Sequence, residues 1–282
     1  MAASVRVKVP ATSANLGPGF DALGVALRIY NTVTVFPSQT PVAAPMAIEA
    51  ASAYFAASAT PPFLFDWQIK GAVPRSRGLG SSVTVRLGIL HGLNALAGSP
   101  LGADAIYRLC ARLEGHPDNA APAAFGGFTV ARRDASYQRF PIASRLKFIL
   151  LIPPFEVPTV EARKVLPPSL PFHDAVSSAA NAAAIAAAFA SGNYEAATGS
   201  FTDHLHQPYR APLIPCLDAV IDAGGKAGAL GGWLSGSGST IACATLRDPG
   251  PIAHAMLTAS GIPESRIVIT TAENRGVRIT TT

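Results

Sequence analysis

A turn with two glycines and two serines carries the residues best suited to binding phosphate. It consists of Pro74, Arg75, Ser76, Arg77, Gly78, Leu79, Gly80, Ser81 and Ser82. Glycine permits a tight turn and close approach to a ligand, and serine is a common helix N-cap. The apolar residues that follow have helical spacing, and the free N–H groups at a helix start attract phosphate. The turn therefore predicts a phosphate site, although an ordinary capped loop would have the same sequence.

Charged and amide side chains lie in further segments that could bind a small polar molecule. They are a glycine-rich loop at 10–21, the run Glu114-Gly115-His116-Pro117-Asp118-Asn119, and the segments Thr159–Arg163 and Gln207–Arg210. Carboxylates and amides suit an ammonium group, whereas arginine can hold a carboxylate with two hydrogen bonds. The late segment Ser235, Gly236, Ser237 and Gly238 predicts either a ligand-binding loop or a tight hairpin turn.

Two series of strands and helices are expected to position these segments. In the first, strands are predicted at 5–9, 30–36 and 65–73, with Pro10 ending the first strand, and helices at 48–57, after Ser82 and at 103–114. A buried strand at 145–153 begins the second series, with helices at 159–166 and 174–190 and strands within 228–246, 266–271 and 276–281. We therefore expect two domains, residues 1–145 and 146–282.

The composition argues against several classes of protein. The chain has 282 residues, of which 49% are hydrophobic and 14% charged, so a large core is expected rather than disorder. The formal charge of +5 comes from scattered cations, which argues against nucleic acid and favours small anionic ligands. No apolar run reaches the roughly 20 residues that span a bilayer. The 3 cysteines form no metal or disulfide pattern, so we expect a cytoplasmic protein with no membrane partner.

These segments, taken in order, resemble the motifs of the GHMP small-molecule kinases, and within them the homoserine kinase family. The similarity extends over nearly the whole chain. It implies an α+β fold of two domains, an N-terminal half like ribosomal protein S5 and a ferredoxin-like C-terminal half, with the active site between them. It also implies phosphorylation of the L-homoserine hydroxyl by ATP with Mg²⁺, giving O-phospho-L-homoserine for threonine biosynthesis. A homodimer is compatible with the resemblance.

The resemblance assigns phosphate and metal roles to particular residues. The turn at 74–82 and the loop at 235–238 would contact the nucleotide phosphates. Ser82 and Glu114 would hold Mg²⁺. The alternative metal position lies two residues before Glu114, where this chain has Arg112.

The resemblance also assigns the substrate contacts. Arg163 and Arg210 would bind the homoserine carboxylate, and the ammonium would meet Asp21, Asp118 and Asn119. The reacting hydroxyl would lie near Asn15 and Thr159. For Asp118 we prefer substrate binding to a role as general base, and His116 is either functional or a structural residue of its turn.

The sequence departs from the family pattern after the glycine turn. Val83, Thr84, Val85 and Arg86 replace an alanine-rich helix start, and Arg86 could face the nucleotide. Residues 37–62 are shorter than usual and lack an Asp-Asn segment, which affects the expected adenosine site. Two alternative functions stay open: a related kinase acting on another small alcohol, and a non-catalytic member of the fold that binds a ligand. Nucleic-acid binding is a more distant alternative.

Overall fold

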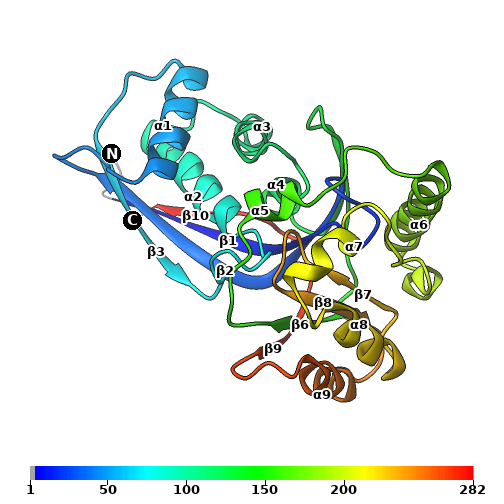
Figure 1. Ribbon diagram of the computed structural model, residues 1–282. Helices are drawn as coiled ribbons and strands as arrows, with labels where there is room; N and C mark the ends of the chain where they lie inside the picture. Colours follow the sequence, from blue (N-terminus) through cyan, green and yellow to red (C-terminus); the bar gives the residue numbers. More distant parts are fainter. Residues whose placement is uncertain (1–3, 282) are drawn as a thin grey trace.

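The computed structural model describes residues 4–281 and contains two antiparallel sheets with helices packed against them, in agreement with the predicted α+β class (Figure 1). The first sheet has the order β10-β1-β2-β4-β5, with β3 also paired to β2. Its strands are β1 (Val5–Ala14), β2 (Leu23–Pro37), β3 (Phe65–Gly71), β4 (Phe128–Ala131), β5 (Tyr137–Phe140) and β10 (Arg278–Thr281). No helix within 4–281 has both the length and the apolar character needed to cross a membrane.

Strands β1 and β2 are longer than the sequence predicts. The prediction that Pro10 ends the first strand is wrong, because pairing with β2 continues to Ala14. The register shifts between Pro10 and Ala11, which accommodates a residue that has no N–H to donate to the ladder. As a result, β1 carries the beginning of the 10–21 loop directly to the functional site.

Four helices cover one face of the first sheet (Figure 1). They are α1 (Pro45–Ser58), α2 (Ser81–Leu96), α3 (Ala103–Glu114) and α4 (Ala120–Phe125). Helix α2 lies so close to β2 that a Cβ at Gly88 or Gly92 would overlap Val33 or Val35. This contact fixes the start of α2, and with it the phosphate turn, against the sheet.

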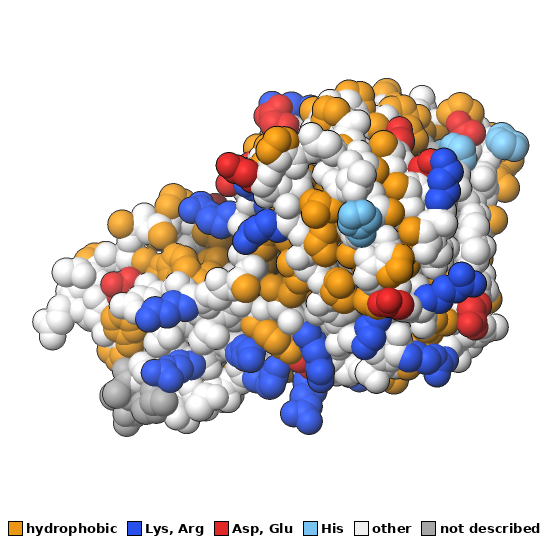
Figure 2. Space-filling view, turned by 90° about the horizontal axis from the view of Figure 1, so that it is seen from below, with side chains coloured by type: hydrophobic (Ala, Val, Ile, Leu, Met, Phe, Trp, Pro, Cys, Tyr) orange, Lys and Arg blue, Asp and Glu red, His pale blue; other side chains and the backbone are white. Residues whose placement is uncertain are grey.

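The opposite face of the first sheet includes a groove lined by cations. Lys8, Arg28, Lys70 and Arg266 border it together with Tyr30. Figure 2 shows the molecule from below, with Lys and Arg side chains spread over this side. Part of the positive charge that is scattered along the sequence therefore gathers outside the helical layer.

The second sheet has the order β7-β8-β6-β9. Its strands are β6 (Lys147–Ile152), β7 (Gly231–Leu234), β8 (Ile241–Thr245) and β9 (Arg266–Thr271). The α-helices of this half are α5 (Thr159–Lys164), α6 (Phe172–Ser191), α7 (Gln207–Arg210), α8 (Leu217–Lys226) and α9 (Pro249–Ser260), with short 3₁₀ turns at 194–197 and 211–213. Buried Ile149, Leu151 and Cys243 join α8 and α9 to this sheet.

The chain passes between the two sheets twice. It leaves the first sheet after β5 and returns with β10, which pairs with β1 through Val5 and Thr281. An isolated bridge between Leu27 and Ala272 lies beside the return. The division at residue 145 stays a prediction, and β10, which lies beyond it, belongs to the first sheet.

Candidate functional site

A cleft of about 570 Å³, partly open to solvent, gathers polar residues from both halves of the chain. It is lined by Asn15, Phe20, Asp21, Ser76, Gly78, Gly80, Ser81, Ser82, Val83, Glu114, His116, Asp118, Asn119, Thr159, Arg163, Arg210, Gly236 and Ser237. Segments separated by more than 200 residues in the sequence thus face one cavity. It contains all the residues expected to bind substrate or metal, and all three catalytic candidates.

The phosphate turn reaches this cleft with only part of its length. Ser76, Gly78, Gly80, Ser81 and Ser82 line it. Gly80, with φ 67°, is the N-cap of α2, so the expectation that a serine caps the helix is wrong. The N-cap position has a left-handed backbone conformation, which glycine adopts without strain. Gly80 therefore takes this position, and both serines lie in the first turn of α2. Their backbone N–H groups belong to the end of the helix that attracts anions.

The other residues of the turn have different partners. Leu79 is fully buried. Arg77 donates from Nε to the Pro153 carbonyl at 3.1 Å and from Nη2 to the Pro154 carbonyl at 2.6 Å. Pro74, Arg75 and Arg77 border an outer cavity instead of the cleft. Arg75 also lines a further cavity beside the phosphate turn, whereas Pro74 and Arg77 line neither that cavity nor the cleft.

The loop at 235–238 packs directly on the phosphate turn. Ser235 Oγ donates to the Gly78 carbonyl at 2.7 Å, and Gly236 N donates to the Ala14 carbonyl at 3.2 Å. Ser235 is fully buried, whereas Gly236 and Ser237 line the cleft. One end of this loop therefore fixes the turn, and its tip faces the cavity.

Ser82 and Glu114 form the expected pair at the start of α2. Ser82 Oγ donates to Glu114 Oε2 at 2.8 Å. The other carboxylate oxygen, Oε1, accepts from Arg86 Nη1 at 2.6 Å. Arg86 does not line the cleft, so the idea that it faces the nucleotide is not supported by its position. Arg112 is exposed and borders a different cavity, together with Gly115 and Pro117.

The donor set of Ser82 and Glu114 fits Mg²⁺. Mg²⁺ prefers hard oxygen ligands and keeps several waters, so one hydroxyl and one carboxylate from the protein are enough. Both oxygens lie at the end of α2 where phosphates are expected, and Glu114 Oε2 has only the Ser82 hydroxyl as a recorded partner within residues 4–281.

Asp118 lines the cleft and is almost completely buried. Its Oδ1 lies 2.6 Å from His116 Nδ1 and accepts from Asn119 N at 2.8 Å. Asn119 in turn accepts at Oδ1 from Thr12 Oγ1 at 2.6 Å. Burial alone would lower the pKa of His116, but the hydrogen bond and charge of Asp118, with a contribution from Asp21, raise it.

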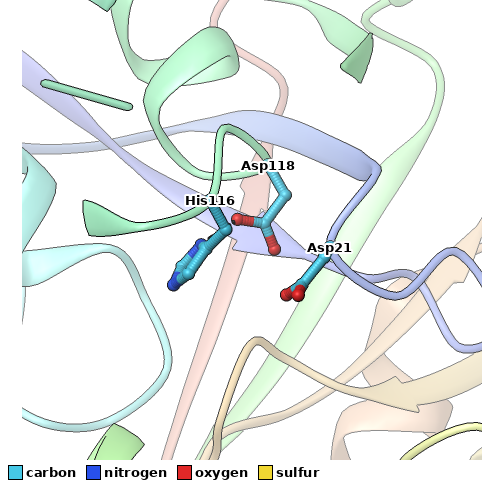
Figure 3. A group of neighbouring side chains, drawn as sticks. All are labelled: Asp21, His116 and Asp118. Atoms are coloured by element: carbon cyan, nitrogen blue, oxygen red, sulfur yellow. Dashed lines mark hydrogen bonds and ion pairs between the residues drawn. The ribbon is translucent and has the colours of Figure 1, made fainter. Parts of the chain in front are cut away.

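The carboxylate of Asp118 lies between the side chains of His116 and Asp21 in Figure 3. One nitrogen or oxygen of each lies within 4.8 Å of those of the other two. Because His116 Nδ1 already bonds to Asp118, that nitrogen is not free to ligate a metal ion, and the two carboxylates remain as acceptors for an ammonium group. This geometry fits the amine-binding role expected of the two aspartates.

Arg163 and Asp21 form a two-pronged ion pair across the cleft. Arg163 Nη2 lies 2.7 Å from Asp21 Oδ1, and Nη1 lies 3.1 Å from Oδ2. Asp21 has φ 56°, and its N–H donates to Asn15 Oδ1 at 3.1 Å. Asn15 Nδ2 donates to the Gly236 carbonyl at 3.0 Å. The early loop is therefore held to both the α5 segment and the late glycine loop.

Arg210 is 2% exposed but keeps its charge. Burial, followed by the neighbouring Arg163, lowers its pKa to about 10, well above neutral pH. Nε donates to the Ala162 carbonyl at 3.0 Å and Nη1 to the Gly236 carbonyl at 3.1 Å. Within the described part of the chain, Nη2 has no recorded partner, which leaves donors for a ligand in the cleft.

Phe20 and His206 support this arginine and were not predicted from the sequence. The Phe20 ring stacks on His206 with centroids 5.0 Å apart and lies 5.1 Å from the Arg210 guanidinium carbon. Burial lowers the pKa of His206 to about 4, so the ring is neutral. Its Nε2 lies 2.9 Å from the Gly17 carbonyl and its Nδ1 lies 3.2 Å from Arg210 Nη1, so Nε2 carries the proton.

Thr159 lies at the rim of the cleft, at the start of α5. Its Oγ1 is 3.3 Å from Ser237 Oγ. The pair joins α5 to the tip of the late glycine loop, next to the position expected for a reacting hydroxyl.

A second cavity adjoins the phosphate turn on its other side. It is open to solvent and shares Ser76, Ser81 and Ser82 with the cleft. Met46 and Trp67 are among the apolar residues that line it. The two cavities therefore meet at the start of α2.

Comparisons with known proteins agree with this geometry. Residues 45–127 match the GHMP kinases N terminal domain and residues 176–262 match the GHMP kinases C terminal domain. A homoserine kinase from Moorella thermoacetica is 38% identical over 276 residues, covering 91% of this chain and 93% of that protein. A homoserine kinase from a Synechococcus strain is 40% identical over 295 residues and covers 96% of each chain.

The solved structures lead to the same family. The crystal structure of homoserine kinase from Cytophaga hutchinsonii has a TM-score of 0.90 at 25% identity and covers 99% of this chain and 98% of that one. A mevalonate kinase structure has a TM-score of 0.73 at 14% identity, which reflects the shared fold alone. From the matched domains and the extent of identity, we conclude that the chain belongs to the homoserine kinase family of the GHMP kinases.

Proposed function

We propose that this protein transfers the terminal phosphoryl group of ATP to the side-chain hydroxyl of L-homoserine, giving O-phospho-L-homoserine for threonine synthesis. The observation that carries the proposal is the convergence, in one cleft, of a phosphate-binding helix start with arginines and aspartates suited to an amino acid. The site has opposite charges for the two ends of a zwitterion and a separate anion site for the nucleotide.

We assign the nucleotide to the start of α2 and the cavity beside it. The triphosphate would receive N–H donors from residues 78–82. The base would enter the apolar cavity near Met46 and Trp67, which supplies contacts despite the short 37–62 segment. When bound, Mg²⁺ held by Ser82 and Glu114 would neutralise charge on the phosphates.

We assign homoserine to the opposite wall. Arg210 and Arg163 would hold its carboxylate, and Asp118 and Asn119 would receive its ammonium group, with Asp21 beside them. Binding the carboxylate to Arg163 requires part of the Arg163–Asp21 pair to open, which frees Asp21 for the ammonium. The hydroxyl would then lie near Asn15 and Thr159, facing the phosphates.

The chemical step needs orientation more than a strong base. The homoserine oxygen forms a bond to the terminal phosphorus as the bond from that phosphorus to the bridging oxygen breaks and ADP leaves. The hydroxyl proton passes to the transferred phosphoryl group. Asp118 Oδ1 is already engaged, because it accepts from Asn119 N and lies 2.6 Å from His116 Nδ1. We therefore retain it as a substrate-binding residue.

A coupled assay of ADP release tests the proposal. L-homoserine should be phosphorylated in preference to L-threonine, L-serine and mevalonate, and the reaction should require Mg²⁺. Preference for an alcohol without an ammonium group would instead support a related kinase, and binding without turnover would support a ligand-binding protein. A cytoplasmic location, where ATP is available, and a homodimer belong to the same proposal. Localisation of a tagged protein and light scattering test them.

A further inference from the structure

Arg86 is placed beside the proposed metal ligand rather than on the nucleotide. Its Nη1 lies 2.6 Å from Glu114 Oε1, and the two side chains are 14% and 7% exposed. Glu114 Oε2 faces the Ser82 hydroxyl on its other side. The carboxylate is thus fixed at both oxygens before any ligand binds.

The same arginine reaches a third element. Its Nη2 lies 3.1 Å from Glu49 Oε2 on α1. The first residues of α1, Pro45 and Met46, line the apolar cavity assigned to the nucleotide base. A continuous chain of polar contacts therefore runs from α1 through Arg86 and Glu114 to Ser82 at the phosphate turn.

We infer that Arg86 is a positioning residue for the metal site, which orients Glu114 through Oε1, balances its charge, and connects it to the helix that borders the base cavity. The inference rests on the proposed function and adds a residue that the family motifs do not assign. Direct contact between Arg86 and the nucleotide is disfavoured, since each Nη has a carboxylate partner and the side chain does not line the cleft.

The buried charges explain why an arginine suits this position. Removing one member of a buried ion pair leaves the other charge uncompensated, so Glu114 depends on a partner. Only a guanidinium offers separate nitrogens for two carboxylates in a fixed plane, whereas lysine presents one point charge. Burial opposes the charge of Arg86, but Glu114 and Glu49 outweigh it and raise the pKa of Arg86.

The positive charge of Arg86 should lower the affinity of the Glu114 site for a free divalent cation. With Arg86 present, its guanidinium offsets part of the negative charge of Glu114 and Glu49, which lowers the attraction for a free divalent ion. Without Arg86 the site gains one negative charge, and a divalent ion a few ångströms away binds about tenfold more tightly even with water-like screening. Catalysis should change in the opposite direction, because Glu114 loses the contact that orients it.

The test compares Arg86→Gln and Arg86→Lys with the wild-type enzyme, using binding of Mn²⁺ to nucleotide-free protein by electron paramagnetic resonance and the kcat for homoserine. Arg108→Gln is the control, since Arg108 pairs with exposed Asp104 on α3. We expect Arg86→Gln to bind Mn²⁺ about tenfold more tightly and to lose at least about tenfold in kcat. Arg86→Lys should keep the wild-type Mn²⁺ affinity and recover part of kcat, and the control should change neither.

Opposite shifts in the two measurements distinguish positioning from damage to the fold, which would weaken both. Equal Mn²⁺ affinities for wild type and Arg86→Gln, or no binding by either, would overturn the inference. An unchanged kcat in Arg86→Gln would also overturn it. If the wild-type enzyme does not phosphorylate homoserine, the proposed function fails, while the Mn²⁺ measurement still reports on Arg86.

The connection to α1 has its own variant. Glu49→Ala removes the outer contact and leaves Glu114 paired. We expect a higher KM for ATP and a Mn²⁺ affinity that changes less than in Arg86→Gln, because Glu49 is more exposed than Arg86 and lies farther from Ser82. A wild-type KM for ATP would limit the role of Arg86 to Glu114 and contradict the connection.

Discussion

Gly78 and Ser235, 157 residues apart, form the contact that locks the two glycine loops together. The Ser235 hydroxyl donates to the Gly78 carbonyl at 2.7 Å, and a Cβ at Gly78 would overlap the Ser235 carbonyl oxygen. Gly78 also has φ 70°. The phosphate turn therefore depends on the second half of the chain for its shape.

Gly78→Ala should disrupt this contact and lower both stability and activity. Gly98→Ala is a matched control, because Gly98 has φ 83° but open space around its Cα. A left-handed alanine costs about 1–2 kcal/mol, which both variants share. We expect Gly78→Ala to lower the free energy of unfolding beyond the control and to reduce kcat/KM for ATP. Equal losses in urea unfolding would mean that the loop contact contributes nothing further.

Arg210→Ala should raise the KM for homoserine at least tenfold, the scale of a lost charged hydrogen bond of about 1.5–3 kcal/mol. The KM for ATP should change little, since Arg210 lies on the opposite wall. Because Arg210 is buried, circular dichroism must first establish that the variant is folded. Arg145→Ala, which removes an exposed contact to Gly192, is the control. A wild-type KM in folded Arg210→Ala would remove this residue from the substrate site.

Ser82→Ala tests the hydroxyl that faces Glu114. It should weaken the use of Mg-ATP more than the binding of homoserine, since only the nucleotide side loses a ligand. Initial rates measured over a range of Mg²⁺ and homoserine concentrations separate the two effects. A larger change in the KM for homoserine would contradict the metal assignment.

The His116–Asp118 pair should make stability depend on pH. The folded-state pKa of His116 is raised above 6.5, so its contribution is fully present below that pH and is lost as pH rises through the folded pKa. Wild type should therefore exceed His116→Gln in unfolding free energy at about pH 6, and the difference should shrink toward about pH 9. A difference that grows with pH would show that the pair is not held by a charged imidazole.

Local patterns predicted most of the elements. Helix α3 occupies residues 103–114 as expected, because its apolar stripe runs through the segment and Gly115 follows directly as the C-cap. The end of β1 was missed because proline is a local stop signal, whereas pairing with β2 extends the strand. Long-range pairing of this kind has no signature in a short window of sequence.

The sequence motifs identified many residues of the site but not the contacts that these residues make with one another. Asp118 and Arg210 are found from motifs, yet Phe20 looks like a core residue and His206 stands just before its motif. From the sequence, the positive charge of Arg86 is unfavourable near the N-terminus of a helix. The structure places Glu114, 28 residues later, beside it, and the two form an ion pair. These pairs depend on tertiary distance, which sequence spacing does not give.

The return of β10 to the first sheet restricts how the active site can admit its substrates. Two domains joined by a single linker can open by a hinge motion. Here the chain connects the two sheets twice, because β10 returns from the second sheet and pairs with β1 at the edge of the first. Entry must therefore come from displacement of rim segments, such as the tip at 236–237 and the start of α5, while the two sheets keep their mutual orientation.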